Sequence, residues 1–170
     1  AQDGIKINQV RNDGVTPLLI ASQCGHEEVV KLFLAQDGIK INLATNDGAT
    51  PLLIASKNGH TKVVSLLLGK EATDINKARK SGETPLSLAT YDGHTEIVKL
   101  LLGIEGININ QANSDGVTPL HIALNKGHME IFKLLLDQEA IDINKANKYG
   151  ETPLLQAAPQ GHKETVELLL

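Results

Sequence analysis

Apolar residues recur in a unit that repeats along the chain with a fixed step of 34 residues. In the first unit, Leu18 and Ala21 are three positions apart, which places both on one face of a short helix. A second apolar stripe with the spacing of an amphipathic helix follows at Val29, Val30, Phe33 and Leu34. The pattern predicts helices over residues 17–24 and 27–35, and an equivalent pair in every later unit.

Turn and capping residues mark the borders of these helices. Residues 12–14 (Asn-Asp-Gly) are typical of a turn, and the extended residues on either side predict a short hairpin. We expect Thr16 to cap the first helix and Pro17 to occupy its first position, where the missing N–H does no harm. Gly25 is expected to end that helix in the left-handed conformation. Each unit is therefore predicted to be a short β-hairpin or turn followed by two antiparallel helices.

Three short motifs keep the same step in every unit. The Thr-Pro-Leu motif begins at Thr16, Thr50, Thr84, Thr118 and Thr152. Gly-His and Ile-Asn recur with the same step, so the 170 residues divide without insertion into units 1–34, 35–68, 69–102, 103–136 and 137–170. Because helices this short are unstable alone in water, each unit must bury its apolar stripe against the next. The sequence predicts an all-α fold, an α-solenoid that forms one domain over residues 1–170.

These motifs resemble the ankyrin repeat. The resemblance covers all five units and rests on four motifs, which in the first unit and its border are residues 13–18, 25–26, 29–32 and 41–42. The period of 34 departs from the roughly 33 residues of the family. The family's His after Thr-Pro-Leu occurs only as His121, so the resemblance implies a Thr–His hydrogen bond only between Thr118 and His121.

Composition and charge exclude several classes of protein. Aromatic residues make up 2% of the chain, so the core is expected to be aliphatic, and the net charge of −4 leaves no basic footprint for nucleic acid. No apolar run is long enough to span a membrane, and no signal peptide is recognised. A single cysteine, Cys24, excludes an internal disulfide framework. We expect a cytoplasmic protein that binds neither nucleic acid nor membranes.

Most residues of reactive type belong to the repeated architecture. Five of the six histidines lie in Gly-His motifs, and equivalent residues of stacked units lie too far apart to ligate one metal ion. No catalytic motif and no phosphate-binding loop is present. The asparagines of the Ile-Asn motif are expected to tether loop backbone: Asn8, Asn42, Asn76, Asn110 and Asn144. The chain is therefore predicted not to be an enzyme and to need no cofactor or metal.

Variable positions mark where a stacked array can recognise a partner. Positions at the hairpin turn and at the end of the first helix vary from unit to unit, and the resemblance places them along a concave groove. From these positions we select candidate partner contacts: Asp13, Asp47, Lys57, Lys80, Glu83, Tyr91, Asp92, Asp115, Asn125, Lys126, Lys148, Tyr149 and Glu151. Both tyrosines of the chain fall in this set, and its mixed charge suits a protein partner better than a phosphate backbone.

The sequence favours a non-enzymatic interaction scaffold that binds a partner protein through the concave groove and the hairpin tips. The alternative is a structural spacer, or an engineered or excised fragment of a solenoid, without a dedicated partner. We expect a monomer that can stack end to end, because the first unit keeps an apolar outward face. Gln156 and Thr165 replace apolar residues of the earlier units and are expected to face outward and cap the last unit.

Overall fold

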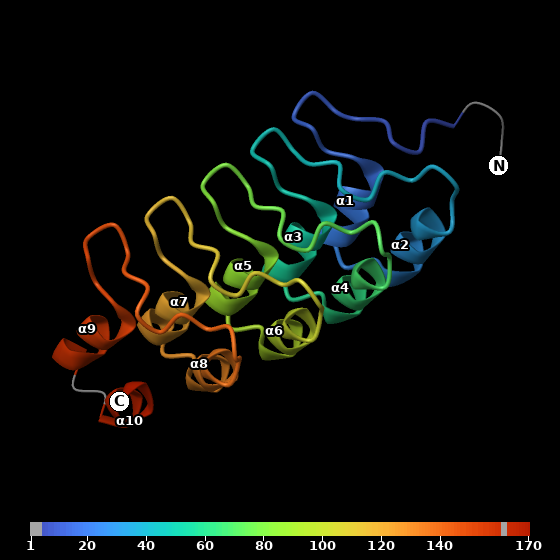
Figure 1. Cartoon of the computed structure of the whole chain (residues 1–170). Helices are drawn as coiled ribbons and strands as arrows, with labels where there is room; N and C mark the ends of the chain where they lie inside the picture. The colour runs from blue at the N-terminus through green and yellow to red at the C-terminus, as the bar shows by residue number, and fades with distance from the viewer. Residues whose placement is uncertain (1–4, 161–162) are drawn as a thin grey trace.

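The computed structural model describes residues 5–160 and 163–170, which form a row of helix pairs (Figure 1). The elements are α1 (Pro17–Gln23), α2 (Glu27–Leu34), α3 (Pro51–Lys57), α4 (Thr61–Leu68), α5 (Pro85–Tyr91), α6 (Thr95–Leu102), α7 (Pro119–Lys126), α8 (Met129–Leu136), α9 (Pro153–Ala157), the 3₁₀ helix η1 (Ala158–Gln160) and α10 (Lys163–Leu169). Odd-numbered helices form an inner row next to the hairpin loops, and even-numbered helices form an outer row. The described residues contain no β-strand, so the predicted all-α solenoid is confirmed.

Every inner helix begins in the same way. The threonine before the helix is extended, and its hydroxyl accepts a hydrogen bond from the backbone N–H three residues later, as Thr16 does from Leu19 at 3.2 Å. The proline that follows occupies the first helical position, where the absent N–H is not needed. Thr84 and Thr118 also form a two-way capping box with the side chain three residues later. The predicted helix starts are confirmed.

Helix ends differ slightly from the prediction. The helices of the first repeat end one residue earlier than expected, because Cys24 and Ala35 act as the C-caps. Helix α9 ends at Ala157 and continues as the 3₁₀ turn η1. Pro159 explains this change, since it has no N–H for the helix and disfavours a helical residue before it. The Gly-His motif of the last unit, residues 161–162, lies outside the described residues.

The predicted hairpins are tight turns that stack on one another without paired strands. The Asn46 backbone N–H donates to the Asp13 carbonyl at 2.8 Å, and one such bond joins each neighbouring pair of hairpins. Gly14 has a φ of +88°, and a Cβ at that position would lie 2.7 Å from Cα of Thr45. Close stacking of the hairpins therefore requires glycine at this turn position.

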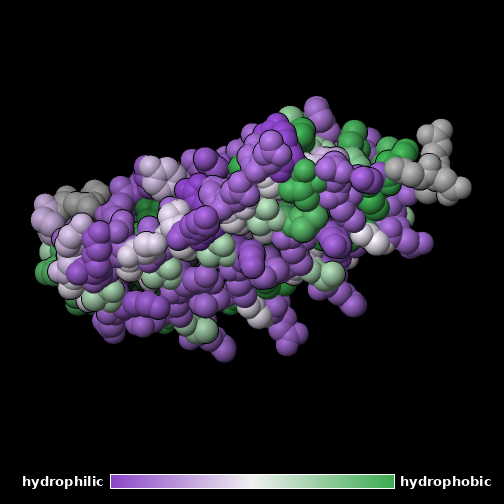
Figure 2. Space-filling view, turned by 90° about the horizontal axis from the view of Figure 1, so that it is seen from above, coloured by the Kyte–Doolittle hydropathy of each residue, from purple (hydrophilic) through white to green (hydrophobic). Residues whose placement is uncertain are grey.

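One hydrophobic cluster runs along the array from Leu18 to Leu169. A small residue recurs where neighbouring inner helices pack against each other. It is fully buried at Ala55, Ala89 and Ala123, as expected where helices approach each other closely. Seen from the side of the hairpin loops, the surface is mostly hydrophilic (Figure 2). The core therefore lies between the two rows of helices, and the hairpins present polar groups to solvent.

The prediction that Thr165 faces outward is wrong. Its side chain is 1% exposed, and Oγ1 lies 3.7 Å from Sδ of Met129 in the preceding repeat. The equivalent residues of the middle repeats are equally buried: Val63, Ile97 and Ile131. This position of the outer helix faces the preceding repeat, so it is exposed only at Val29 in the first repeat. Gln156, the other expected cap, is half-buried.

The repeated asparagines tie each repeat to the next, as predicted. Asn110 Nδ2 donates to the Ala140 carbonyl at 2.7 Å, and its Oδ1 accepts from the Asp142 N–H at 2.9 Å. The same two bonds are made by Asn8, Asn42 and Asn76. The side chain of Asn144 makes neither bond within the part of the chain that the structure describes.

We expect Asn110→Ala to lower the free energy of unfolding by about 1–3 kcal/mol, because two hydrogen bonds of about 0.5–1.5 kcal/mol each are lost. Asn144→Ala is the matched control and should change that free energy by less than about 0.5 kcal/mol. Urea unfolding followed by circular dichroism checks both variants. Equal losses would show that the bonds between repeats do not stabilise the array.

The Gly-His histidines join neighbouring repeats. The Nε2 atoms of His60, His94 and His128 lie 2.9, 2.9 and 3.3 Å from backbone carbonyl oxygens of the preceding inner helix. Each of these histidines also occupies the N-cap position of an outer helix, in agreement with the predicted turn and helix start. Their ring nitrogens are thus directed at backbone carbonyls, which supports their structural interpretation.

His121 is fully buried and hydrogen-bonded at both ring nitrogens. Its Nδ1 lies 2.7 Å from Thr118 Oγ1 and accepts from the Thr118 N–H at 3.3 Å, which is the bond that the resemblance implied. Its Nε2 faces the Glu151 carbonyl at 3.1 Å. Burial lowers the pKa of His121, because the charged ring would lose its contact with water, and this effect outweighs the opposing contribution of Glu151.

The free energy of unfolding is therefore expected to fall as the pH drops below about 6.5. In this range the histidine binds a proton in the unfolded state but stays neutral in the native state. His121→Leu, with the residue found at the equivalent Leu19, Leu53 and Leu155, should lack this contribution. As the pH is lowered from about 7 to about 5, the melting temperature of this variant should therefore fall less than that of the parent. A difference between the two proteins that does not change with pH would contradict this role for His121.

Candidate functional site

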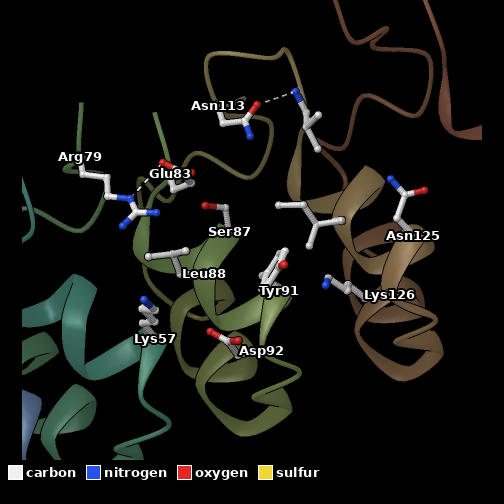
Figure 3. Close-up of a pocket in the computed structure, with 12 residues that line it drawn as sticks. Lys57, Arg79, Glu83, Ser87, Leu88, Tyr91, Asp92, Asn113, Asn125 and Lys126 are labelled. Atoms are coloured by element: carbon white, nitrogen blue, oxygen red, sulfur yellow. Dashed lines mark hydrogen bonds and ion pairs between the residues drawn. The ribbon is translucent and has the colours of Figure 1, made fainter. Parts of the chain in front are cut away.

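A hollow of about 540 Å³ lies beside the inner helices of repeats 3 and 4. We call it the central groove, and its lining residues are Lys57, Arg79, Glu83, Ser87, Leu88, Tyr91, Asp92, Asn113, Val117, Ile122, Asn125 and Lys126. The side chain of Tyr91 lies in its middle, with Leu88 on one side and Lys126 on the other (Figure 3). The groove thus joins the hairpins to the C-terminal ends of α5 and α7.

Tyr91 is held by the next repeat at both its backbone and its ring. It is the last residue of α5, its carbonyl lies 3.3 Å from His128 Nε2, and it is 49% exposed. The ammonium of Lys126 lies 3.7 Å from the centroid of the tyrosine ring, so the ring's electrons attract the cation. The repeat that follows therefore contacts both the backbone and the exposed ring of Tyr91.

An ion pair forms the hairpin wall of the groove. Arg79 Nε lies 3.1 Å from Glu83 Oε2, and both side chains are about three-quarters buried or more. Burial opposes the charge on Glu83, but hydrogen bonds from Arg79 and Ser81 outweigh it and lower the pKa of Glu83. The hydrogen bond that Arg79 donates to Glu83 also raises the pKa of Arg79. The pair therefore stays ionised at neutral pH and leaves this wall nearly neutral.

The rim of the groove carries charges of both signs. Lys57, Asp92 and Lys126 are exposed, and none of them forms an ion pair with another described residue. The floor is apolar, since Leu88 and Ile122 are 6% and 7% exposed. A buried apolar centre with a polar rim is the usual anatomy of a protein–protein contact surface.

The structure brings together part of the predicted site. The predicted residues that line the groove are Lys57, Glu83, Tyr91, Asp92, Asn125 and Lys126. The others lie outside it, at the hairpins: Asp13, Asp47, Lys80, Asp115, Lys148, Tyr149 and Glu151. The predicted residues therefore divide between the central groove and a second surface, the hairpin edge, which consists of the seven residues outside the groove.

Tyr149 is the most prominent side chain of the hairpin edge. It is 73% exposed, and the Lys148 ammonium lies 5.0 Å from the centroid of its ring. Lys148 also pairs with Asp115 of the preceding hairpin, and the hydrogen bond that its ammonium donates to this carboxylate raises the pKa of Lys148. The last two hairpins thus present one aromatic ring beside a neutralised charge pair.

Three acidic residues of the hairpin edge hold their own turns. A hydrogen bond from Arg11 lowers the pKa of Asp13 to about 2, and the carboxylate also accepts from the Val15 N–H. Asp47 accepts from the Thr45 hydroxyl, and Glu151 accepts from Asn147 Nδ2 at 2.9 Å. These carboxylates are charged at neutral pH, but part of their hydrogen-bonding capacity is already used within the chain.

Sequence reasoning missed five lining residues of the groove, Arg79, Ser87, Leu88, Asn113 and Ile122, and it recognised Val117 as a variable hairpin position without selecting it. A signal for three of the five was present, because the position of Arg79 and Asn113 and the position of Ser87 vary along the array. Leu88 and Ile122 occupy a position that is apolar in the first four units, so the pattern assigned them to the core. Apolar character alone does not show that a side chain forms the floor of an open surface.

The described residues hold no group of three or more His, Cys, Asp and Glu side chains placed to bind a metal ion. Cys24 is a free, exposed thiol. Among the described helices, none has the length and apolar character that a membrane crossing needs.

Comparison with known families covers most of the chain. A family model described as ankyrin repeats in 3 copies matches residues 38–113 and 86–170. A second model, described as the ankyrin repeat, matches residues 13–46. No curated protein matches the chain.

Proposed function

The chain belongs to the ankyrin repeat family, whose repeats are generally protein–protein interaction modules, and we propose that it is a non-enzymatic scaffold for a partner protein. The proposed binding surface is the central groove together with the hairpin edge. The observation that carries the proposal is the half-exposed ring of Tyr91, which contacts Lys126 of the next repeat and lies beside an apolar floor. Aromatic residues in such settings are frequent hot spots of protein interfaces.

The chemistry of the groove favours a polypeptide segment as the partner. An apolar side chain of the partner would pack on Tyr91 and Leu88 and displace water from the floor. A basic and an acidic side chain beside it would pair with Asp92 and with Lys57 or Lys126. Nucleic acid fits less well, because acidic side chains would lie against its phosphates.

Capture followed by footprinting tests the proposal. The intact array is used as bait, and hydrogen exchange of the array is then compared with and without the captured protein. Protection of the hairpins and of α5 and α7 is expected, with α6 and α8 unchanged. Protection confined to the outer helices would contradict the proposed surface, and failure to retain any protein would favour the structural spacer.

A further inference from the structure

Charged side chains of the outer helices are all paired. Every acidic or basic residue in α2, α4, α6, α8 and α10 forms an ion pair with a residue of its own helix or of a neighbouring outer helix. The pairs are Glu27–Lys31, Glu28–Lys31, Glu27–Lys62, Glu96–Lys99, Lys99–Glu130, Lys133–Glu164 and Lys163–Glu167. The outer row therefore neutralises its charges within the array.

The inner helices show the opposite arrangement. Their charged residues are Lys57 at the end of α3 and Lys126 at the end of α7, and Asp92 is the C-cap of α5. All three side chains are exposed and line the central groove, yet none pairs with another described residue. Lys57 and Lys126 lie on opposite sides of Tyr91, with Asp92 between them (Figure 3). The groove therefore presents a row of charges in the order positive, negative, positive.

Asp92 is the member of this row that its own helix does not stabilise. The C-terminal end of a helix carries a partial negative charge, which favours lysine there and disfavours aspartate. Lys57 and Lys126 thus suit the ends of α3 and α7, whereas Asp92 does not suit the end of α5. Within the described residues no cation forms an ion pair with Asp92, so a basic side chain of a partner would compensate an unfavourable charge.

The spacing of the row matches an extended polypeptide. The three charges come from the consecutive inner helices α3, α5 and α7, which contact each other in that order. The axes of packed helices are about 8–10 Å apart. A polyproline II segment returns to the same face every three residues, after about 9.3 Å. A β-strand does not, because side chains three residues apart point to opposite faces.

We propose that the central groove binds an extended segment of the partner in which a basic residue is flanked by acidic residues three positions away on each side. This inference rests on the proposed function of the groove. The basic side chain pairs with Asp92, and the acidic side chains pair with Lys57 and Lys126. Residues between them pack on Tyr91 and Leu88, in the manner of polyproline II segments that dock in grooves lined by aromatic side chains.

A peptide selection tests the charge order. A phage-displayed library of random peptides of about 12 residues, which span about 37 Å in polyproline II, is selected on the folded array. The same library is selected on Asp92→Lys and on Lys57→Glu. Lys70→Glu is the matched control, because Lys70 is exposed in the loop after α4 and does not line the groove. All these positions are exposed, so the variants should fold, which circular dichroism verifies.

Peptides selected on the parent should share the order acidic, basic, acidic with a spacing of three. On Asp92→Lys the central basic residue should be replaced by an acidic one, and on Lys57→Glu one outer acidic residue should be replaced by a basic one. Lys70→Glu should select the same peptides as the parent. These changes would show which side chain reads each position of the peptide.

Affinity measurements on a synthetic peptide from the parent selection complete the test. Asp92→Lys should weaken its binding about 10-fold, because an exposed attraction becomes a repulsion. Replacing the central basic residue of the peptide by Glu should restore binding to this variant. The affinity for the parent should fall as salt is added, since exposed charges are screened.

Two groups of results would overturn the inference, and they differ in what they say about the groove. Peptides that share no charge order, or whose charges are about seven residues apart as a helix requires, show that the extended charge pattern is wrong. If those peptides lose binding to Tyr91→Ala, the central groove is still the binding surface. If the selected peptides bind Tyr91→Ala as tightly as the parent, or if no peptide is selected, the proposed function of the groove fails as well.

Discussion

Replacement of Phe132 by Ala is expected to lower the free energy of unfolding by about 3–5 kcal/mol, as is usual when a buried aromatic ring is removed from a close-packed core. Phe132 lies in α8, is 0% exposed and is among the largest fully buried side chains. Removing the ring loses the favourable free energy of its transfer from water to the core. It also leaves a cavity that the neighbouring side chains fill only in part. Urea unfolding monitored by circular dichroism measures the loss.

Phe33 provides the matched control, because it is the other phenylalanine of the chain and is only partly buried. Phe33→Ala should lose less than half as much stability as Phe132→Ala. Phe132→Val should fall between them, since Val30, Val64 and Val98 occupy the equivalent position in other repeats. Equal losses at the two phenylalanines would show that burial at α8 does not determine the cost.

Recurrence explains how much of the fold could be predicted from the sequence. The helix cap at Thr16, the turn at Gly14 and the tether at Asn110 each recur with the same step, and each residue type is well suited to its role. Local chemistry therefore determined these elements. The direction of Thr165 could not be predicted in this way, because its neighbour in space, Met129, belongs to the preceding repeat.

The candidate site was accessible to sequence reasoning only in part. Variable positions include Tyr91 and Lys126, whose contact follows from the stacking of α5 and α7. The floor of the groove was not predicted, since equivalent apolar residues differ in burial: Ile20 is 45% exposed and Leu88 is 6% exposed. Ile54, which has a repeat on each side, is only half-buried, so neither apolar character nor an internal place in the array settles the burial of this position.

Tyr91→Ala is expected to weaken partner binding by about 2 kcal/mol or more, which corresponds to a rise in Kd of about 30-fold. The ring lies in the middle of the central groove, where a partner can pack on it and on the apolar floor beside it. The melting temperature should change little, because the side chain is half-exposed and lies outside the core cluster. Titration calorimetry with the captured partner and thermal unfolding measure the two effects.

Ala89→Leu serves as the reciprocal control, because it lies two residues away but faces the packed seam. Ala89 is 0% exposed, so the larger side chain should overpack the inner helices and cost about 1–3 kcal/mol of stability. The Ala89→Leu protein that remains folded should bind the partner more tightly than the Tyr91→Ala protein does. Tyr149→Ala, on the hairpin edge, then locates the partner. If Tyr91→Ala binds as tightly as the parent and Tyr149→Ala does not, the hairpin edge is the binding surface and the central groove is not.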